Sequence, residues 1–255
     1  MVIASPDNPK IKHIQKLLSK PKFRKETREY IVESSHHLND ILETSPRDIQ
    51  YLLYTTLSNE LTETLNNESI SYFEISDSLL KKCTDVKQSS GLIAVVHYPV
   101  QSSGPLNTSA FYLDKISNPR NLGAVIRNSA AFGLTTLYIS PESVDPFHPE
   151  SVRASAGTLN KVRVIEASLE EVIKENPTIE VLCLDSNATQ VLNQASLSTP
   201  HLIILGSENG FSSSTLKLSK LNSYKIPLQN NVDSLNLAVT SGIIGNFIQL
   251  SKPDS

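Results

Sequence analysis

Five nearly continuous apolar runs in the second half of the chain constrain its fold more than any other feature. They are AFYLD (110–114), TTLYIS (135–140), VRVIE (162–166), EVLCLD (180–185) and HLIILG (201–206). Strands that are apolar on both faces belong to a parallel sheet that helices cover on each side. Segments suited to such crossover helices lie between the runs, at 121–132, 149–156, 168–175 and 212–219. A strand near 224–228 and a terminal helix from Ser234 to Leu250 complete the predicted α/β domain.

The first hundred residues predict a second, smaller α/β unit. Short strand-like runs lie at 30–33, 49–54, 70–75 and 92–98, and helical patterns lie around 8–19, 35–43, 58–66 and 77–83. Residues 99–109 are rich in Pro, Ser, Gly and Asn and lack an apolar period, which is typical of a linker. The predicted organisation is therefore a domain at 1–98, a linker at 99–109 and a domain at 110–255.

Composition excludes several classes of protein. With 39% hydrophobic and 19% charged residues the chain has a globular composition. No apolar run approaches the roughly 18 residues that span a bilayer, and the N-terminal segment lacks the hydrophobic core of a signal peptide. We therefore expect a soluble cytoplasmic protein with no membrane partner. Cys83 and Cys183 have neither metal-ligand nor redox spacing, so we expect reduced thiols and no metal site.

Local charge differs from the overall net charge of −3 between Lys10 and Arg28. This stretch holds one acid, Glu26, and the cations Lys10, Lys12, Lys16, Lys20, Lys22, Arg24, Lys25 and Arg28. Such a run of cations can follow a phosphate backbone. A solvated helix face would have the same composition, so the charge alone leaves both interpretations open.

In parallel α/β sheets, ligands bind beyond the carboxyl ends of the strands. The loop after Asp114 leads through Pro119 and Asn121, which suit a turn and a helix start, to Arg127. The neighbours of Arg127 are apolar, so we expect its guanidinium beside the core with a partner. A helix cap with a buried ion pair would explain the same residues. The glycine spacing of a Rossmann fingerprint and the lysine of a P-loop are both absent.

Two further loops follow apolar strands. Gly206 and Gly210 bracket Glu208, at a place where a ligand can meet bare backbone amides. Glu208 could accept a hydrogen bond from a substrate hydroxyl or hold Arg127, although a tight turn with an incidental acid is the simpler alternative. The other loop begins at Ile226 and leads to a last helix. Ser234 suits the N-cap of that helix, and Asn236 would present its side chain near the same helix start.

Taken together, these loops resemble the three signature motifs of the SpoU/TrmH family of RNA 2′-O-ribose methyltransferases. The motifs are N-x-G-x-x-x-R…F-G from Asn121, G-x-E-x-G from Gly206, and I-P…S-L-N from Ile226, in the family's order and spacing. The run 148–157 resembles the family's stretch between the first two motifs. The first domain resembles the family's L30-like substrate-binding module, through YIVE from residue 30 and SGLIAVV from residue 90.

The resemblance implies a catalytic domain with a deep trefoil knot, a homodimer with shared active sites, and S-adenosylmethionine as the cofactor. It implies that backbone groups of Gly206, Ile226 and Leu235 bind the cofactor. The residues that would carry catalysis are Asn121, Arg127, Glu208, Ser234 and Asn236. Glu208 would position Arg127, and the other polar groups would orient the ribose. Since a guanidinium is effectively never deprotonated, we expect Arg127 to clamp a phosphate and stabilise the developing alkoxide.

Arg120 departs from the family pattern, because many members have Gly there, and the glycine pattern around Gly210 and Phe211 is shifted slightly. The additional first domain favours ribosomal RNA as the substrate, with tRNA as the runner-up. Lys22, Arg24, Lys25 and Arg28 then become candidates for an RNA-docking surface. The rival hypotheses are a catalytically silent RNA-binding protein of the same fold and an unrelated nucleotide-binding α/β enzyme.

Overall fold

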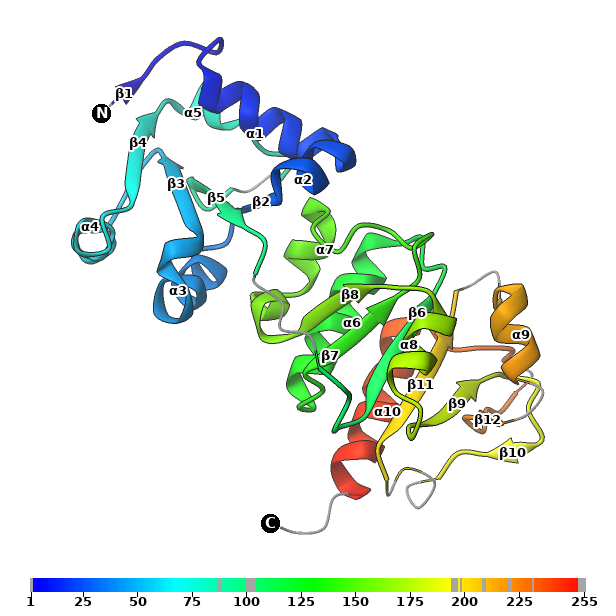
Figure 1. Ribbon diagram of the computed structural model, residues 1–255. Helices are drawn as coiled ribbons and strands as arrows, with labels where there is room; N and C mark the ends of the chain where they lie inside the picture. The colour runs from blue at the N-terminus through cyan, green and yellow to red at the C-terminus, as the bar shows by residue number, and fades with distance from the viewer. Residues whose placement is uncertain are drawn as a thin grey trace. The chain divides into compact units, whose positions relative to one another are not determined.

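The computed structural model describes residues 2–86, 89–99, 104–193, 197, 199–207, 210–219, 222–230 and 232–251. The chain folds into two compact units, which Figure 1 shows from blue at the N-terminus to red at the C-terminus. The first unit contains residues 1–100 together with 147–160, and the second contains 101–146 and 161–255. Both units combine a sheet with helices, so the prediction of two α/β modules is confirmed.

The first unit is built on a five-stranded mixed sheet with the strand order β1-β4-β3-β5-β2. The strands are β1 (Val2–Ile3), β2 (Glu29–Val32), β3 (Ile49–Tyr54), β4 (Ser71–Ile75) and β5 (Leu92–His97). The helices are α1 (Pro9–Ser19), α2 (Pro21–Thr27), α3 (Ser35–Thr44), the short η1 (Pro46–Asp48), α4 (Asn59–Asn67) and α5 (Asp77–Leu80). Each of the four strands and four helices predicted for this region has a counterpart, whereas β1, α2 and η1 were not predicted.

Helix α1 shows how the sequence builds this unit. The Asn8 side chain caps it by accepting a hydrogen bond from Lys10 N at 2.9 Å. Ile11, Ile14 and Leu17 recur at helical spacing and are fully buried against the sheet. The helix ends before Pro21, which disfavours a helical residue in front of it and starts α2 instead.

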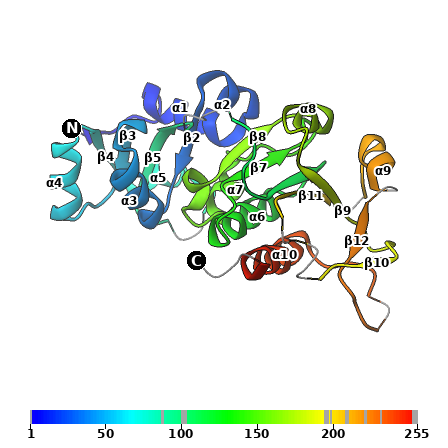
Figure 2. The same cartoon turned by 60° about the horizontal axis from the view of Figure 1, so that its bottom comes forward.

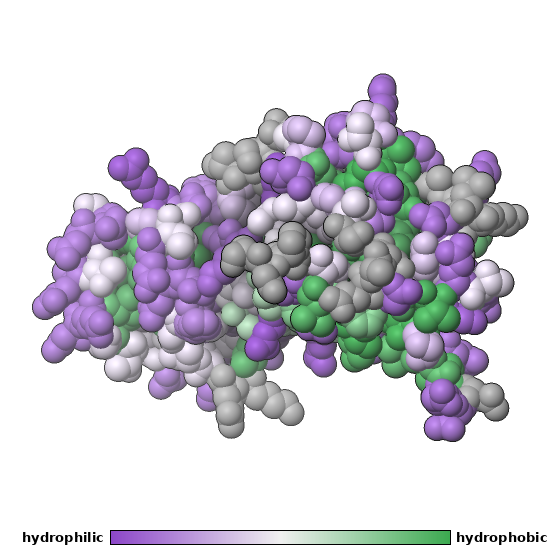
Figure 3. All heavy atoms as spheres, turned by 90° about the horizontal axis from the view of Figure 1, so that it is seen from below, coloured by the Kyte–Doolittle hydropathy of each residue, from purple (hydrophilic) through white to green (hydrophobic). Residues whose placement is uncertain are grey.

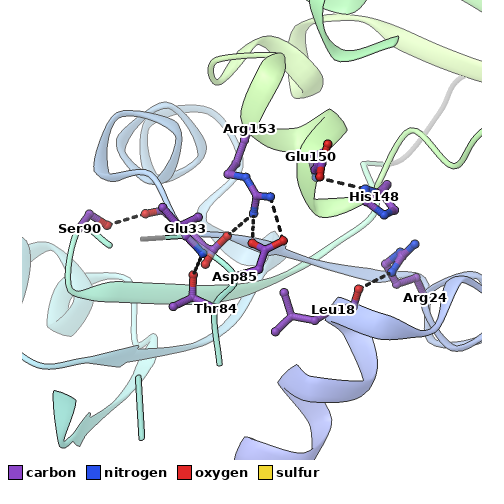
Figure 4. Close-up of polar contacts among 10 residues, drawn as sticks. Leu18, Arg24, Glu33, Thr84, Asp85, Ser90, His148, Glu150 and Arg153 are labelled. Atoms are coloured by element: carbon purple, nitrogen blue, oxygen red, sulfur yellow. Dashed lines mark hydrogen bonds and ion pairs between the residues drawn. The ribbon is translucent and has the colours of Figure 1, made fainter. Parts of the chain in front are cut away.

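Residues 147–160 pack with the first unit, although the predicted boundaries assigned them to the second domain. They include α7 (Pro149–Ala154) and most of the short helix η2 (Thr158–Lys161). Arg153 holds the segment in place, as Figure 4 shows: its Nη1 lies 2.9 Å from Glu33 Oε2 and 2.7 Å from Asp85 Oδ1. Two aromatic rings, Tyr98 and Phe147, also stack at 3.6 Å between centroids. Ion pairing and stacking, which have no sequence periodicity, therefore fix the segment.

The second unit has seven strands, and every neighbouring pair is parallel. The strands, in their order across the sheet, are β10 (Gln190–Val191), β12 (Ser223–Lys225), β9 (Glu180–Leu184), β11 (His201–Gly206), β6 (Ala110–Asp114), β7 (Thr136–Ile139) and β8 (Arg163–Glu166). The helices are α6 (Pro119–Ala131), α8 (Leu169–Glu175), α9 (Ser213–Ser219) and α10 (Leu237–Ser251). The predicted parallel sheet is confirmed, and the trefoil knot stays a prediction.

The last helix begins later than predicted. Asn236 caps it, because its Oδ1 accepts a hydrogen bond from Ala238 N at 2.9 Å and its carbonyl accepts one from Thr240 N. Ser234, the predicted N-cap, lies exposed before the helix. Helix α10 then packs along α6, as Figure 2 shows. Asn128 of α6 joins the two by donating to Ala238 O at 2.7 Å and to Ser241 Oγ at 2.8 Å.

Both cysteines are free and buried. Burial, with a smaller contribution from the negative charges of Asp185 and Asp114, raises the pKa of the Cys183 thiol to about 12. At neutral pH this thiol is therefore protonated and unreactive. In the part of the chain that the structure describes, no helix is both long and apolar enough to cross a membrane.

Candidate functional site

A cavity of about 340 Å³ opens at the carboxyl ends of β9, β11 and β12. Four segments of the chain line it. Their lining residues are 184–187; 205–207, 210 and 211; 225, 226 and 228; and 233–235, 237 and 240. Gly206, Ile226 and Leu235, the three residues predicted to bind a cofactor, all line it. The structure therefore brings together loops that are far apart in the sequence at the edge of the sheet where parallel α/β folds bind ligands.

The cavity combines apolar and charged walls. Leu205, Leu228 and Leu237 supply apolar surface, while Asp185, Lys225 and Asp233 contribute the charged side chains of the lining. Asp185 is held in place because its Oδ1 accepts hydrogen bonds from the backbone and side-chain nitrogens of Asn187 at 2.9 Å and 3.2 Å. Such a lining suits an amphipathic ligand that carries both positive and negative groups.

Glycine is required at Gly206, the last residue of β11, because the Phe211 ring approaches it closely. A Cβ on Gly206 would lie 2.8 Å from two ring carbons of Phe211, closer than real Cβ contacts. Ser207 and Gly210 close the turn, with Gly210 N donating to Ser207 O at 2.9 Å and Gly210 at a φ of +86°. Glu208, the predicted partner of Arg127, lies outside the described residues, so its role stays a prediction.

Two of the predicted polar residues meet beside this cavity. Asn236 Nδ2 donates to Asn121 Oδ1 at 3.1 Å, joining the start of α10 to the start of α6. Asn121 lines a small hollow to which Ser207 and Leu237 also contribute, and both of these residues line the main cavity as well. Ser234 is exposed and lines the main cavity. Three of the five predicted catalytic residues therefore lie around one connected surface.

Arg127 is placed differently from the prediction. It is exposed, and the described part of the chain offers its guanidinium no hydrogen bond or ion pair, so the expected position beside the core is wrong. Helix α6 buries Leu122, Val125 and Ile126 instead. Arg127 follows Asn121 by six positions, which is about one and two thirds turns of helix and leaves the two side chains about 120° apart around its axis. The two residues thus lie on different faces of α6.

The four predicted RNA-binding residues also separate. Arg24 is only 1% exposed, and its Nη1 donates to Leu17 O at 2.6 Å, so it joins α2 to the end of α1. Lys22, Lys25 and Arg28 are exposed. The guanidinium carbon of Arg28 lies 5.4 Å from the centre of the Tyr98 ring. The sequence could not show that Arg24 is buried while its basic neighbours are exposed, because a hydrogen bond to a backbone carbonyl leaves no recognisable sequence pattern.

Sequence comparisons match both units to known families. Residues 109–246 match the SpoU rRNA Methylase family, and residues 8–94 match the MRM3-like substrate binding domain. A 23S rRNA (guanosine(2553)-2′-O)-methyltransferase, RlmP of Bacillus subtilis, is 26% identical over 95% of this chain and 96% of its own length. An uncharacterized tRNA/rRNA methyltransferase of Synechocystis is also 26% identical, over 95% of this chain and 91% of its own length.

Structural comparison gives the same fold. The AdoMet-bound rRNA methyltransferase from Sinorhizobium meliloti matches with a TM-score of 0.84 and 23% identity, covering 98% of this chain and 97% of its own. The SpoU methyltransferase AviRb from Streptomyces viridochromogenes, in complex with AdoMet, matches with a TM-score of 0.84 and 22% identity over 95% of this chain and 97% of its own. Nearly the whole chain, with both units, thus has the architecture of these enzymes.

Proposed function

The chain belongs to the SpoU rRNA methylase family, and we propose that it transfers a methyl group from S-adenosylmethionine to a ribose 2′-hydroxyl of ribosomal RNA. The observation that carries the proposal is the cavity at the strand ends, where Gly206, Ile226 and Leu235 meet next to the hydrogen-bonded pair of Asn121 and Asn236. A binding cavity and a group of polar side chains at its rim are what a transfer reaction between two bound molecules requires.

The cavity suits S-adenosylmethionine, the cofactor that this family uses. Its volume of about 340 Å³ falls in the usual range for small-molecule sites. Leucine side chains and the Phe211 ring can cover the adenine, and Asp185, Asp233 and Lys225 can meet the charged groups. Bound there, the cofactor would supply an electrophilic methyl group on a sulfonium.

The chain's own residues would align and activate the RNA hydroxyl. Asn121 and Asn236, fixed by their mutual hydrogen bond, would orient the ribose together with Ser234. Arg127 would bind the neighbouring phosphate and stabilise the negative charge that develops on the 2′-oxygen as its proton passes to water. Glu208 would hold the guanidinium of Arg127. The leaving thioether is neutral, so no general acid is needed.

We further propose that the protein acts as a homodimer through α10. This helix exposes Val239, which is 51% exposed, and Leu250, which is 56% exposed. Figure 3 shows the face from below, on which apolar surface interrupts the hydrophilic surface of the second unit. Asn121 lies beside the cavity of its own chain, whereas Arg127 lies on a different face of α6. In a homodimer, the Arg127 of each protomer could instead reach the cavity of its partner.

We propose that residues 1–98 recruit RNA, that 99–109 link, and that 110–255 catalyse. The match to a substrate-binding domain over residues 8–94 and the name of the Bacillus subtilis relative both support ribosomal RNA. The Synechocystis relative is named for tRNA or rRNA, so tRNA is the alternative that the experiment must distinguish.

Transfer of radiolabelled methyl from S-adenosylmethionine to undermethylated total RNA, fractionated by size, tests this proposal. We expect label in a ribosomal RNA, and resistance of one phosphodiester to alkaline cleavage, because a 2′-O-methyl group removes the attacking hydroxyl. Label in the tRNA fraction would reassign the substrate, and label on a base would contradict the 2′-hydroxyl as acceptor. Cofactor binding without label in any RNA, including assembled ribosomal particles, would favour the catalytically silent alternative.

The exposed cations of α2 and its C-terminal end give a separate prediction. Changing Lys22, Lys25 and Arg28 together to Glu should weaken RNA binding and reduce the slope of log Kd against log salt by about 2, because three phosphate contacts are lost. Filter binding across a salt series measures both quantities. Lys174→Glu, an exposed lysine of α8, controls for the loss of positive charge. An unchanged slope in the triple variant would remove these residues from the RNA surface.

A further inference from the structure

Asp114 is a buried carboxylate to which the mechanism above gives no task. It is the last residue of β6, near the middle of the parallel sheet, and is 1% exposed. It lies directly beside Gly206 in the register between β6 and β11, so both residues end their strands at the same edge. Burying a carboxylate costs free energy unless hydrogen bonds compensate. The hydrogen-bond partner of Asp114 therefore indicates what this residue does at the sheet edge.

The carboxylate reaches across to the loop that forms one wall of the cavity. Asp114 Oδ2 accepts a hydrogen bond from Ser212 N at 2.7 Å, a short contact of the charge-assisted kind. Ser212 directly precedes α9 and caps it, since Leu216 N donates to Ser212 O at 2.9 Å and Thr215 N donates to Ser212 Oγ at 3.4 Å. One carboxylate oxygen thus fixes the point at which the loop becomes a helix.

Fixing Ser212 also restrains Gly210 and Phe211, the two cavity-lining residues just before it. Phe211 precedes Ser212 and lays its ring against Gly206, at 2.8 Å from the place of a Cβ. Ser207 and Gly210 are tied to each other by the hydrogen bonds of the turn. All four of the residues Gly206, Ser207, Gly210 and Phe211 line the cavity. Among the described residues, Gly206 is held by the sheet and Ser212 is held by Asp114.

We propose that Asp114 is a positioning residue for the cofactor: through Ser212 it holds Gly210 and Phe211 where they line the site that binds S-adenosylmethionine. This inference rests on the proposed function. Asp114 acts through the backbone of Ser212 and does not touch the methyl group or the RNA. The feature that matters is a hydrogen-bond acceptor at this point, and its loss leaves the Phe211 wall of the cavity free to move.

Binding of S-adenosylhomocysteine, measured by calorimetry on the full chain, tests the proposal with three variants. Asp114→Ala removes the acceptor and should raise Kd at least about ten-fold, the effect of losing one hydrogen bond to a charged group. Asp114→Asn keeps a carbonyl oxygen near the position of Oδ2 and should bind more tightly than Asp114→Ala, because a neutral acceptor retains about half of a charge-assisted hydrogen bond. Ser140→Ala is the matched control, since Ser140 Oγ accepts a hydrogen bond from Lys115 N at the same sheet edge without contacting the loop.

A second measurement separates positioning from a general loss of structure. RNA affinity should stay the same in all three variants, because the loop lies in the cofactor cavity and not among the cations of α2. Equal binding of the cofactor product by wild type and Asp114→Ala would overturn the proposal. Equally weak binding by Asp114→Asn and Asp114→Ala would overturn it as well, because the charge and not the acceptor would then be required.

Hydrogen exchange on the unmodified protein covers the case in which Asp114→Ala does not fold. The Ser212 amide should be protected before any ligand is added, and exchange at the rate of a free loop would contradict the hydrogen bond to Asp114. The wild-type titration also keeps the two proposals distinguishable. If wild type does not bind S-adenosylhomocysteine at all, the proposed function fails. If wild type binds and only the variant pattern is absent, the role of Asp114 alone fails.

Discussion

Replacing Arg127 with alanine is expected to lower the rate of methyl transfer by about 10²- to 10³-fold, the usual effect of removing one group that stabilises a developing oxyanion. Arg127 is exposed, and within the described part of the chain its removal would break no hydrogen bond or ion pair. The variant should therefore fold as well as wild type, within about 0.5 kcal/mol. It should also bind S-adenosylhomocysteine normally, because Arg127 does not line the cavity. Single-turnover methyl transfer and calorimetry measure the two effects separately.

Arg127→Lys distinguishes two ways in which the arginine can act. A lysine keeps the charge but loses the planar fork that binds a phosphate through two parallel hydrogen bonds, so this variant should remain well below wild type. Lys174→Ala, which removes an exposed cation from α8, should have no effect on the rate. Near-normal turnover by Arg127→Lys would show that charge alone is enough, and near-normal turnover by Arg127→Ala would remove this residue from the mechanism.

The parallel sheet could be predicted because its cause lies in the sequence itself. Strands buried on both faces must be apolar throughout, and the run at 201–206 is buried from His201 to Leu205. The short strands β1 and β10 could not be predicted, because two residues carry no period. The start of α10 was misplaced because Ser234 and Asn236 are both good N-caps, and only the hydrogen bond to Ala238 decides between them.

The candidate site was predicted in part for a related reason. Loops after parallel strands converge by topology, so Gly206, Ile226 and Leu235 could be grouped before their distances were known. Arg127 could not be placed, since apolar neighbours in sequence do not say which side of a helix a residue occupies. The sequence placed Asp114 at the end of a strand but could not predict its hydrogen bond, because the partner is 98 residues away. Contacts of that range leave no local pattern.

Gly245→Ala is expected to destabilise the second unit by about 1–3 kcal/mol, because it adds a methyl group to a well-packed contact. Gly245 is buried on α10, where a Cβ would lie 2.3 Å from Cδ2 and 2.8 Å from Cγ of Phe132 at the end of α6. The Cβ of Phe132 would be 3.1 Å away, so moving the ring out of its packed position would relieve the severe overlaps and still leave one tight contact. The Phe132 ring or one of the two helices must therefore shift, and urea unfolding measures the loss of stability.

Gly242→Ala, one turn earlier on the same helix, is the matched control. Its added Cβ would meet Asn128 Nδ2 at 3.5 Å, an ordinary contact. Without a clash, the higher helix propensity of alanine should stabilise this variant by about 0.5–1 kcal/mol. The two substitutions should therefore change stability in opposite directions, although both glycines lie on α10 and face α6. Shortening the neighbour with Phe132→Ala should remove most of the Gly245→Ala penalty, since the two changes meet at one contact. Equal stability of the two alanine variants would contradict the close approach of α6 and α10.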